Sequence, residues 1–497
     1  MNGDLLDLEA LSSLPDGLME AFRHALRTAG YDGRILGQAE AIAPRQFDAV
    51  RLPLVHAWLA RQPGAAPLLA RLFAYRDGVP REQAFDVLGR EVGGALEACG
   101  VFVPDDDRIR CSMRLLPFGR VWIASDDADA RHDPVMGPGA TTQELLTTLP
   151  TPMPARVLDV GCGAGSLALA AARAGAASVT AIDLDPRAVT LTRWNARLND
   201  LEVAAHAGDL LAPVRERQFD LILAQPPFVP QPPGVEATTY LHGGSRGDEL
   251  ALRLLGELPG AMAPGGRALV LVDTAPPAGQ ATIERIRDAL PEIPLQLSVI
   301  TAMGHESHAL AIGYAAAADS TLGPAFAEAA QRYAAHVEAL GITHTRHALV
   351  VLRKPLPNEP SWAVSVEPRN HTLYGAPLLR RLDAAMALAT LAPDDLVQAK
   401  VQPPAGAALV QSHPLDGQGP TTFRFVSPGG RAPDQELSSA ALLLLDLAAQ
   451  TDTVAALVEA YAEACEDDPA RVKAAVLDFL RKALVSGMLE PREDSSS

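Results

Sequence analysis

Cysteine is scarce in this chain: only four of the 497 residues are cysteines, and no two of them form a Cys-x-x-Cys pair. They are Cys99, Cys111, Cys162 and Cys465. This spacing excludes a disulfide framework and a zinc ribbon, and it favours a reducing, cytoplasmic compartment. Long apolar runs are also lacking, since none approaches the ~20 residues that span a bilayer. The first ten residues are acidic, so we expect neither a signal peptide nor a membrane segment.

Positive charge is in deficit, with 42 Lys and Arg against 60 Asp and Glu and a net charge of −18. The negative electrostatic potential of such a protein repels phosphate backbones and anionic lipids, so we expect no non-specific nucleic-acid binding. Arginines alternate along residues 108–120, a pattern more typical of a solvated strand face than of a basic wing. Residues His305–His308 lack the His-Glu-x-x-His spacing, so no bound metal is expected. Schiff-base chemistry is not expected either, because none of the four lysines lies in a cluster of glycines or carboxylates in the sequence.

Residues 1–130 read as helices followed by a hairpin. Helical periodicity covers residues 18–30, where Gly30 ends the helix, and then 58–73 and 82–97. The period changes to two from Ile109 to Leu115, followed by a turn at Pro117–Gly119 and a returning strand through Val121 and Ile123. This order predicts a winged-helix-like module. The acidic run Ser125–Asp129 then predicts an exposed linker.

Residues 131–355 alternate short β-rich runs with helical ones, which predicts an α/β domain with a seven-stranded, doubly wound, Rossmann-like sheet. The expected strands are 156–160, 178–183, 203–206, 221–224, 267–272, 295–300 and 347–353. A long helix over 323–340 separates the last two strands.

The remaining sequence divides at about residue 436. Residues 356–436 are rich in Pro and Gly, contain a short strand candidate at 422–426, and suggest no particular fold. Residues 437–497 contain helical stretches at 440–448, 454–461 and 472–484, the last ended by Gly487. We therefore expect a C-terminal α+β part that ends in a small helical or winged-helix-like module.

A glycine-rich turn carries the strongest local signal. The apolar strand that includes Asp159 runs into Gly161-Cys162-Gly163-Ala164-Gly165, and a helix follows. Glycines let the backbone turn sharply and approach a ligand, whose negative group can meet the free N–H groups at the helix start. Alone, this turn suits any nucleotide-like cofactor, including NAD.

Two aspartates close the next two expected strands. Asp183 follows the second strand, where a carboxylate can accept hydrogen bonds from both ribose hydroxyls of an adenosine-containing cofactor. Asp209 follows the third strand, where it can accept from an adenine amino group. Each aspartate alone also fits a helix N-cap. With Leu184 and Leu210 beside them, they complete the candidate cofactor contacts.

The fourth strand ends in Gln225-Pro226-Pro227-Phe228. This tetrapeptide resembles the Asn-Pro-Pro-Tyr/Phe motif of class I S-adenosylmethionine-dependent methyltransferases, a group that includes the release-factor glutamine and ribosomal RNA guanine and adenine N-methyltransferases. The resemblance implies that the first amide, which also borders the cofactor, and the following proline carbonyl accept hydrogen bonds from a planar NH₂. It also implies that the aromatic ring stacks on the substrate. These four residues are the candidate catalytic residues.

The resemblance covers about residues 130–355. Residues Tyr240–Asp248 resemble the glycine segment after the fourth strand in the glutamine methyltransferase branch, which makes His242, Gly243 and Gly244 candidate substrate contacts. Asn195 and Asn199 match an asparagine-containing helix of the family. Residues Pro134–Thr142 occupy the place of a loop that closes over the cofactor, so Thr141 and Thr142 join the candidate substrate contacts.

These observations predict a methyltransferase that uses S-adenosylmethionine and yields S-adenosylhomocysteine. Residues 437–491 resemble the small recognition modules of peptide-modifying enzymes, which favours a peptide or protein acceptor. A small metabolite or RNA, methylated on nitrogen or oxygen, remains the alternative. Gln225 stands where the family usually has Asn and sets the amide one methylene further out, which leaves an oxygen acceptor open. A dehydrogenase would need neither Asp209 nor this tetrapeptide.

Overall fold

The computed structural model describes residues 7–42, 48–126, 133–236, 238–302, 304–319, 322–366, 375–415, 420–427 and 435–492. By its contacts the chain divides into two compact units. The first comprises Met1–Leu295 and Gly304–Pro357, and the second comprises Gln296–Met303 and Asn358–Ser497. Within the described ranges, no helix combines the length and the apolar character needed to cross a bilayer. The finer four-part division expected above stays a prediction.

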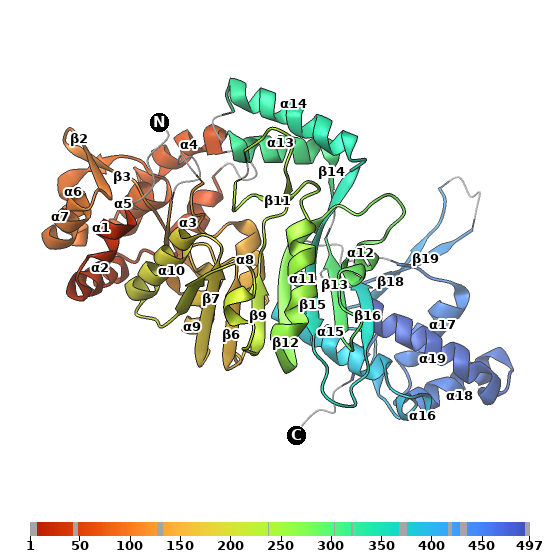
Figure 1. Cartoon of the computed structure of the whole chain (residues 1–497). Coiled ribbons are helices and arrows are strands. Elements are labelled where there is room, and N and C mark those ends of the chain that lie inside the picture. The colour runs from red at the N-terminus through yellow and green to blue at the C-terminus, as the bar shows by residue number, and fades with distance from the viewer. Residues whose placement is uncertain are drawn as a thin grey trace. The chain divides into compact units, whose positions relative to one another are not determined.

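The N-terminal part of the first unit is helical, as the periodicity predicts. Its helices are α1 (Leu8–Ser12), α2 (Asp16–Thr28), α3 (Gly33–Glu40), α4 (Asp48–Leu59), α5 (Ala65–Leu69), a π-helical turn at Ala70–Ala74, α6 (Arg81–Leu88) and α7 (Arg90–Ala98) (Figure 1). Gly30 follows α2 with a φ of 64°, which confirms it as the end of that helix. The helix expected over 82–97 is instead two helices, because Gly89 adopts a φ of 88° between them. The single helix expected over 58–73 is wrong as well, because α4 ends at Leu59 and Gly64, with a φ of 100°, precedes α5.

The expected hairpin is present in altered form. The strands of the N-terminal region are β1 (Val79–Pro80), β2 (Phe102–Asp105), β3 (Arg108–Cys111), β4 (Arg114–Phe118) and β5 (Val121–Ser125). The single strand expected from Ile109 to Leu115 is wrong, because Ser112 and Met113 separate β3 from β4. β3 joins the antiparallel sheet β1-β3-β2, and β4 pairs only with β5 in the described chain. The turn lies at Gly119 and Arg120, since β4 continues through Phe118. The winged-helix assignment is not confirmed.

The acidic run after β5 begins in the protein interior. The side chains of Ser125 and Asp126 are 1% and 2% exposed. Asp126 forms a bidentate ion pair with Arg187, at 2.6 and 3.1 Å, and accepts a hydrogen bond from the Val135 N–H at 2.9 Å. The expectation of an exposed linker is therefore wrong at its start, because a partner 61 positions away neutralises the carboxylate. Residues 127–129 lie outside the described ranges.

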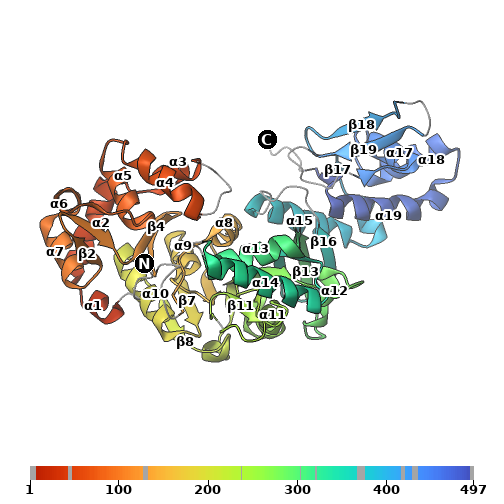
Figure 2. The ribbon, with the colours of Figure 1, turned by 90° about the horizontal axis from the view of Figure 1, so that it is seen from above.

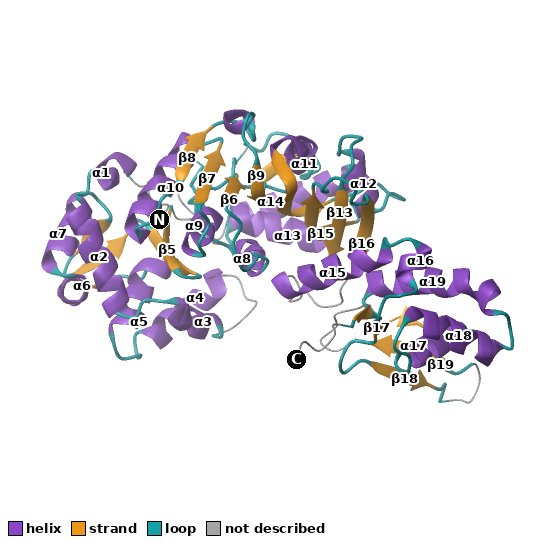
Figure 3. Cartoon of the chain, turned by 90° about the horizontal axis from the view of Figure 1, so that it is seen from below, coloured by secondary structure: helices purple, strands orange, loops and turns teal. Residues whose placement is uncertain are grey.

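The sheet of the first unit follows the order β15-β12-β9-β6-β7-β8. Its strands are β6 (Arg156–Val160), β7 (Ser178–Asp183), β8 (Ala204–Ala207), β9 (Phe219–Ala224), β12 (Met262–Thr274) and β15 (His344–Arg353), with the short β14 (His305–Glu306) paired to β15. β15 runs antiparallel to β12, and the other neighbours along this path are parallel. Figure 3 shows β8, β7, β6 and β9 in a row among helices. Because the chain continues from β6 to β7 on one side and reaches β9 on the other, the strand order reverses at β6, where ligands of open α/β sheets bind.

Helices connect and cover these strands. They are α8 (Ala140–Thr147), α9 (Ser166–Arg173), α10 (Pro186–Asn199), α11 (Glu249–Ala261), α12 (Thr282–Asp288), α13 (Ser307–Ala318) and α14 (Pro324–Ala339). α9 packs on β6 and β7, and α10 packs on β7, β8 and β5. α13 and α14 run side by side (Figure 2), and the helix expected over 323–340 is confirmed as α14. The sequence reasoning missed α13.

The predicted count of seven strands in one sheet is not confirmed. All seven expected ranges form strands, but the sixth, β13 (Gln296–Thr301), belongs by its contacts to the second unit. There it pairs in parallel with β16 (Trp362–Val366).

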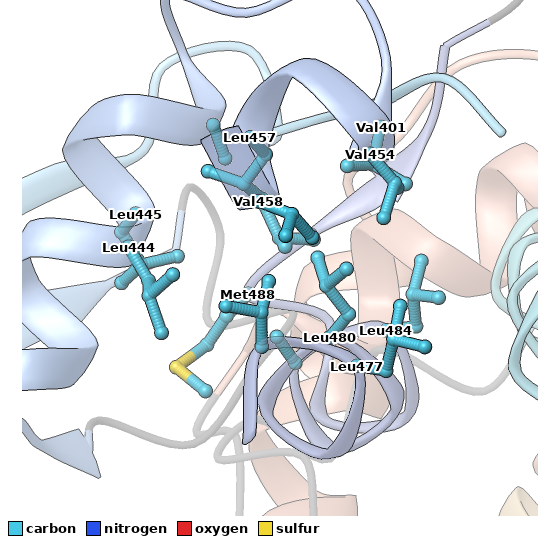
Figure 4. Packing of buried hydrophobic residues seen from close by; sticks show 14 of the residues in the cluster. Val401, Leu444, Leu445, Val454, Leu457, Val458, Leu477, Leu480, Leu484 and Met488 are labelled. Carbon is cyan, nitrogen blue, oxygen red and sulfur yellow. The ribbon is translucent and has the colours of Figure 1, made fainter. Parts of the chain in front are cut away.

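The second unit also has regular structure where the sequence suggested no fold. Its other elements are α15 (Ala376–Ala389), α16 (Pro393–Leu396), β17 (Val401–Gln402), β18 (Ala408–Ser412), β19 (Thr422–Val426), β20 (Gln435–Glu436), α17 (Ser439–Ala448), α18 (Val454–Cys465), α19 (Pro469–Ser486) and β21 (Glu490–Pro491). One apolar cluster joins Val401 to Leu444, Leu457 and Leu480 (Figure 4). Residues on both sides of position 436 therefore share this core. The expected end of α19 at Gly487 is confirmed by its φ of 78°.

Candidate active site

A cavity of about 450 Å³ lies at the carboxyl ends of β6, β7, β8 and β9. It brings together most of the candidate residues, although they come from distant parts of the chain. Those that line it are Thr141, Thr142, Asp159, Gly161, Cys162, Gly163, Asp183, Leu184, Asp209, Leu210, Gln225, Pro226, Pro227 and His242. Gly165, Phe228, Gly243 and Gly244 are not part of this lining. A volume in this range suits a small-molecule ligand.

The glycine turn after β6 is held against the next strand. The N–H groups of Gly161 and Cys162 donate to the carbonyl of Ile182, at 2.8 and 3.0 Å. Gly165, with a φ of 83°, ends the turn, and a Cβ there would come within 2.9 Å of the Thr192 side chain. The role of Gly165 is therefore the close approach of this turn to α10 rather than contact with a ligand.

Two carboxylates lie under the turn. Asp159 is 2% exposed, and its Oδ2 accepts from the Ala168 N–H at 2.9 Å. Burial raises the pKa of Asp159 to about 7, against the effect of that hydrogen bond. Asp183 accepts from the N–H groups of Gly163 and Asp185, at 2.8 and 3.0 Å. Burial raises the pKa of Asp183 as well, and these N–H groups oppose the shift. Asp183 therefore ties the glycine turn to the end of β7 and also lines the cavity.

The far wall of the cavity is formed by the segments after β7 and β8. Leu184 is 61% exposed although it is apolar, so it offers a free apolar surface to a flat ligand. Asp209 is half-exposed and pairs with Arg253 at 2.5 Å. One of its oxygens is thereby occupied, which the sequence reasoning did not anticipate.

Gln225 is the first residue after β9, and its amide is only half satisfied. Its Nε2 donates to the hydroxyl of Thr141 at 2.6 Å. Its Oε1 is buried and has no hydrogen-bond partner among the residues that the structure describes. Because an unpaired buried carbonyl oxygen costs about 1–3 kcal/mol, its presence needs a reason. A donor from a bound ligand would satisfy it.

The residues after Gln225 separate into two groups. Pro226 and Pro227 line the cavity, whereas Phe228 packs beside a buried cluster that includes Val229, Tyr314 and Tyr333. Gly243 packs so closely on the Pro227 carbonyl that any Cβ would clash with it. Glu249 crowds Gly244 in the same way. These glycines hold the backbone of the motif, and Phe228 connects it to α13 and α14.

His242 fixes one edge of the cavity. It lies in β11 (His242–Gly244), which pairs in parallel with β10 (Val229–Pro230). Its Nδ1 accepts from the Thr238 N–H at 2.9 Å, and its Nε2 lies 2.9 Å from the hydroxyl of Tyr333. Burial lowers the pKa of His242. A neutral ring that accepts at Nδ1 carries its proton on Nε2, so His242 donates to Tyr333 and holds residues 238–240 in place.

Sequence reasoning missed several residues that contact the same region. Thr238, Thr239, Leu250 and Leu254 line the cavity, and no local motif marks them.

A buried histidine, His347 on β15, bridges Asp273 at 2.5 Å and Glu144 on α8 at 3.0 Å. Burial alone would lower the pKa of His347, but hydrogen bonds to the two carboxylates outweigh it and raise the pKa to about 9. The partners are 74 and 203 positions away, so no spacing signal could have revealed them.

Comparison with known proteins places this site in a family. Residues 138–240 match the model of the methyltransferase small domain. A putative protein N5-glutamine methyltransferase of Methanocaldococcus jannaschii is 33% identical over 144 residues, which are 28% of this chain and 73% of that protein. The ribosomal RNA small subunit methyltransferase C of Chromohalobacter salexigens is 33% identical over 232 residues, 42% of this chain and 64% of that protein.

Two further proteins share shorter or weaker likeness. The release factor glutamine methyltransferase of Deinococcus radiodurans is 39% identical over 127 residues, 24% of this chain and 45% of that protein. A solved ribosomal protein L11 methylase from Lactobacillus delbrueckii subsp. bulgaricus aligns with 43% of this chain and 79% of its own at 23% identity, with a TM-score of 0.26, too low to support a conclusion. The sequence matches are enough to show that this chain belongs to the S-adenosylmethionine-dependent methyltransferases with a methyltransferase small domain, in the group of the release factor glutamine and ribosomal RNA small subunit methyltransferases.

Proposed function

We propose that this enzyme transfers a methyl group to a planar nitrogen, an amide or amine, of a peptide or protein. The observation that carries the proposal is the buried Oε1 of Gln225, which lacks a partner at the edge of the cavity. An NH₂ group of the acceptor would supply the missing donor. Pro226, the next residue of the lining, would offer its carbonyl to the second hydrogen.

The cavity fits S-adenosylmethionine. The glycine turn would lie along the amino-acid portion, with Cys162 and Gly163 in contact. The N–H groups of Gly163 and Asp185 use one acceptor position on each oxygen of the Asp183 carboxylate, which has about four, so the carboxylate can also accept from ribose hydroxyls. Leu184 and Leu210 would contact the adenine, and the free oxygen of Asp209 would accept from its amino group. Thr141 and Thr142, which also line the cavity, would close the side nearest the acceptor.

When bound, S-adenosylmethionine supplies an electrophilic methyl group on a sulfonium sulfur. The nitrogen of an amide is a poor nucleophile, because its lone pair is delocalised into the carbonyl group. Gln225 and the Pro226 carbonyl would hold both N–H bonds in one orientation and favour the pyramidal nitrogen that attacks the methyl carbon. Transfer would form the N–C bond and leave the C–S electron pair on sulfur, and the methylated nitrogen would release one proton to water.

A nucleic-acid acceptor is the main alternative, because one relative is named as a ribosomal RNA methyltransferase. The arginines of the N-terminal hairpin region argue against it. Arg110 pairs with Asp105 at 3.0 Å, and Arg108 donates to the carbonyl of Gly78 and lies 4.0 Å from Asp77. Their charges are therefore already partly neutralised. A small-metabolite acceptor, methylated on nitrogen or oxygen, stays possible on chemistry alone.

Deuteromethyl labelling tests the proposal. The full-length protein is incubated with a cell extract and S-adenosylmethionine carrying a CD₃ group, and proteins, nucleosides and small molecules are then analysed separately by mass spectrometry. We expect the label on a side-chain or backbone nitrogen of a peptide. A label on a nucleoside, on a small metabolite or on oxygen would overturn the proposed acceptor.

A calorimetric titration tests the cofactor contacts separately. S-adenosylhomocysteine should bind the parent protein, and NAD should not. Asp183→Ala should weaken that binding by ~1.5–3 kcal/mol, the range for a hydrogen bond to a charged group. Arg156→Ala is a matched control, because it removes an ion pair to Asp220 at the opposite end of the sheet. If both variants bind alike, Asp183 does not hold the cofactor.

A further inference from the structure

Two asparagines on α10 bind the edge of strand β5. The Oδ1 of Asn199 accepts from the Trp122 N–H and its Nδ2 donates to the Trp122 carbonyl, at 2.8 and 2.7 Å. Asn195 makes the same pair of bonds with Ala124, both at 2.8 Å. Both asparagines are fully buried. We call these four bonds the amide ladder.

The geometry of the amide ladder follows from two periodicities. Four residues along a helix advance about 6 Å, and two residues along a strand advance about 6.6 Å. Side chains at positions 195 and 199 therefore meet alternate residues of β5, whose N–H and C=O groups point away from β4. The two amides take the place of a neighbouring strand.

The two asparagines differ in their third bond. The Nδ2 of Asn195 also donates to the carbonyl of Ala164, at 2.8 Å. Ala164 lies in the glycine turn, between Gly163 and Gly165. The Nδ2 of Asn199 instead donates to the carbonyl of Asn195, at 2.8 Å, within α10. Of the two asparagines, Asn195 is therefore the one that connects the β4–β5 hairpin directly to the turn that borders the cavity.

We propose that Asn195 is a positioning residue that couples the β4–β5 hairpin to the cofactor-binding turn. Its single amide holds Ala164 and Ala124 at once, so a displacement of either backbone disturbs the other. When cofactor binding orders the glycine turn, it would also stabilise the hairpin, and a hairpin held in place would preorganise the turn for the cofactor. Such coupling is reciprocal by thermodynamic necessity. This inference rests on the proposed cofactor site.

The chain provides a matched control for the test. Asn195→Ala and Asn199→Ala each remove one rung of the amide ladder, two bonds to β5, and one further bond. We expect both variants to lose similar stability in urea unfolding. In calorimetric titration, Asn195→Ala should bind S-adenosylhomocysteine about tenfold more weakly than the parent, within the usual range of coupling. Asn199→Ala should bind within about twofold of the parent. Equal affinities of the two variants would overturn the inference.

Hydrogen exchange of the parent protein tests the same coupling without a substitution, should either variant fail to fold. With exchange resolved to single amides, saturating S-adenosylhomocysteine should slow the Ala124 N–H more than the Trp122 N–H. Equal slowing, or none, would overturn the inference. If S-adenosylhomocysteine does not bind the parent protein, the proposed cofactor site fails instead, so the two failures are distinguishable.

Discussion

The half-satisfied amide of Gln225 leads to a prediction that separates function from stability. Gln225→Met together with Thr141→Val keeps the size of both side chains but removes both polar partners. The parent has one unpaired buried oxygen, which costs about 1–3 kcal/mol, and one hydrogen bond of 2.6 Å, which contributes about 0.5–1.5 kcal/mol. The double variant removes both the cost of the unpaired oxygen and the contribution of the hydrogen bond. Its free energy of unfolding should therefore lie between about 0.5 kcal/mol below and about 2.5 kcal/mol above that of the parent.

Catalysis should change in the opposite direction. Loss of one preorganised contact at a reacting centre typically costs 10²–10³-fold in turnover, which corresponds to about 2.7–4 kcal/mol. Initial rates are measured with the acceptor found by labelling at saturating S-adenosylmethionine, and unfolding is followed in urea. The single variant Thr141→Val keeps the amide of Gln225 and should retain much of the rate. Parental turnover in the double variant would refute the acceptor role, and a stability loss above about 2 kcal/mol would show that Oε1 has a partner in solution.

Three further changes test other parts of the site. Gln225→Asn shortens the side chain by about one bond length and should draw its amide oxygen away from the acceptor nitrogen, so turnover should fall by about 10²-fold while calorimetric binding of S-adenosylhomocysteine stays near the parental value. Burial raises the pKa of Asp159 to about 7, so the parent should lose stability as pH rises from 4 through 7. Asp159→Asn should lose less, because only the other groups with raised pKa values, such as Asp183 and His347, still contribute, and urea unfolding at pH 5 and pH 8 checks this. Unchanged pH dependence in that variant would contradict the assignment. Burial lowers the pKa of His347, but its two carboxylate partners raise it to about 9, so the parent should exceed His347→Gln by about 3 kcal/mol below pH 6.5. That difference should vanish as pH rises through 9, and a constant difference in urea unfolding between pH 6 and pH 10 would show that protonation does not stabilise the bridge.

The candidate residues at the strand ends were predictable because their signals are local. Asp183 and Gln225 each follow an apolar run that forms a strand, and parallel strands bring their carboxyl ends to one edge. The direction in which a side chain points was harder to predict from the sequence. Phe228 follows the motif in sequence, yet its ring packs beside Tyr333, which lies on a helix about a hundred residues further along.

Burial of charge was the least predictable property. The sequence around Asp126 is strongly acidic and resembles a linker, but Arg187 on α10 pairs with this carboxylate and offsets part of the cost of its burial. The bridge from His347 to Glu144 likewise depends on two elements that only the folded sheet brings together. The α/β fold class and the approximate positions of the main strands follow from periodicity, whereas these pairings depend on tertiary packing.

The amide ladder also bears on how a fragment of this chain would behave in solution. A two-stranded hairpin is marginally stable alone, and a free strand edge recruits other strands. In the intact chain, α10 covers the outer edge of β5 at Trp122 and Ala124. A fragment ending near residue 130 would lack α10 and would expose these backbone groups beside the apolar residues of the hairpin. Self-association is the expected behaviour of such a fragment, so α10 protects this strand edge of the N-terminal region from pairing with other strands.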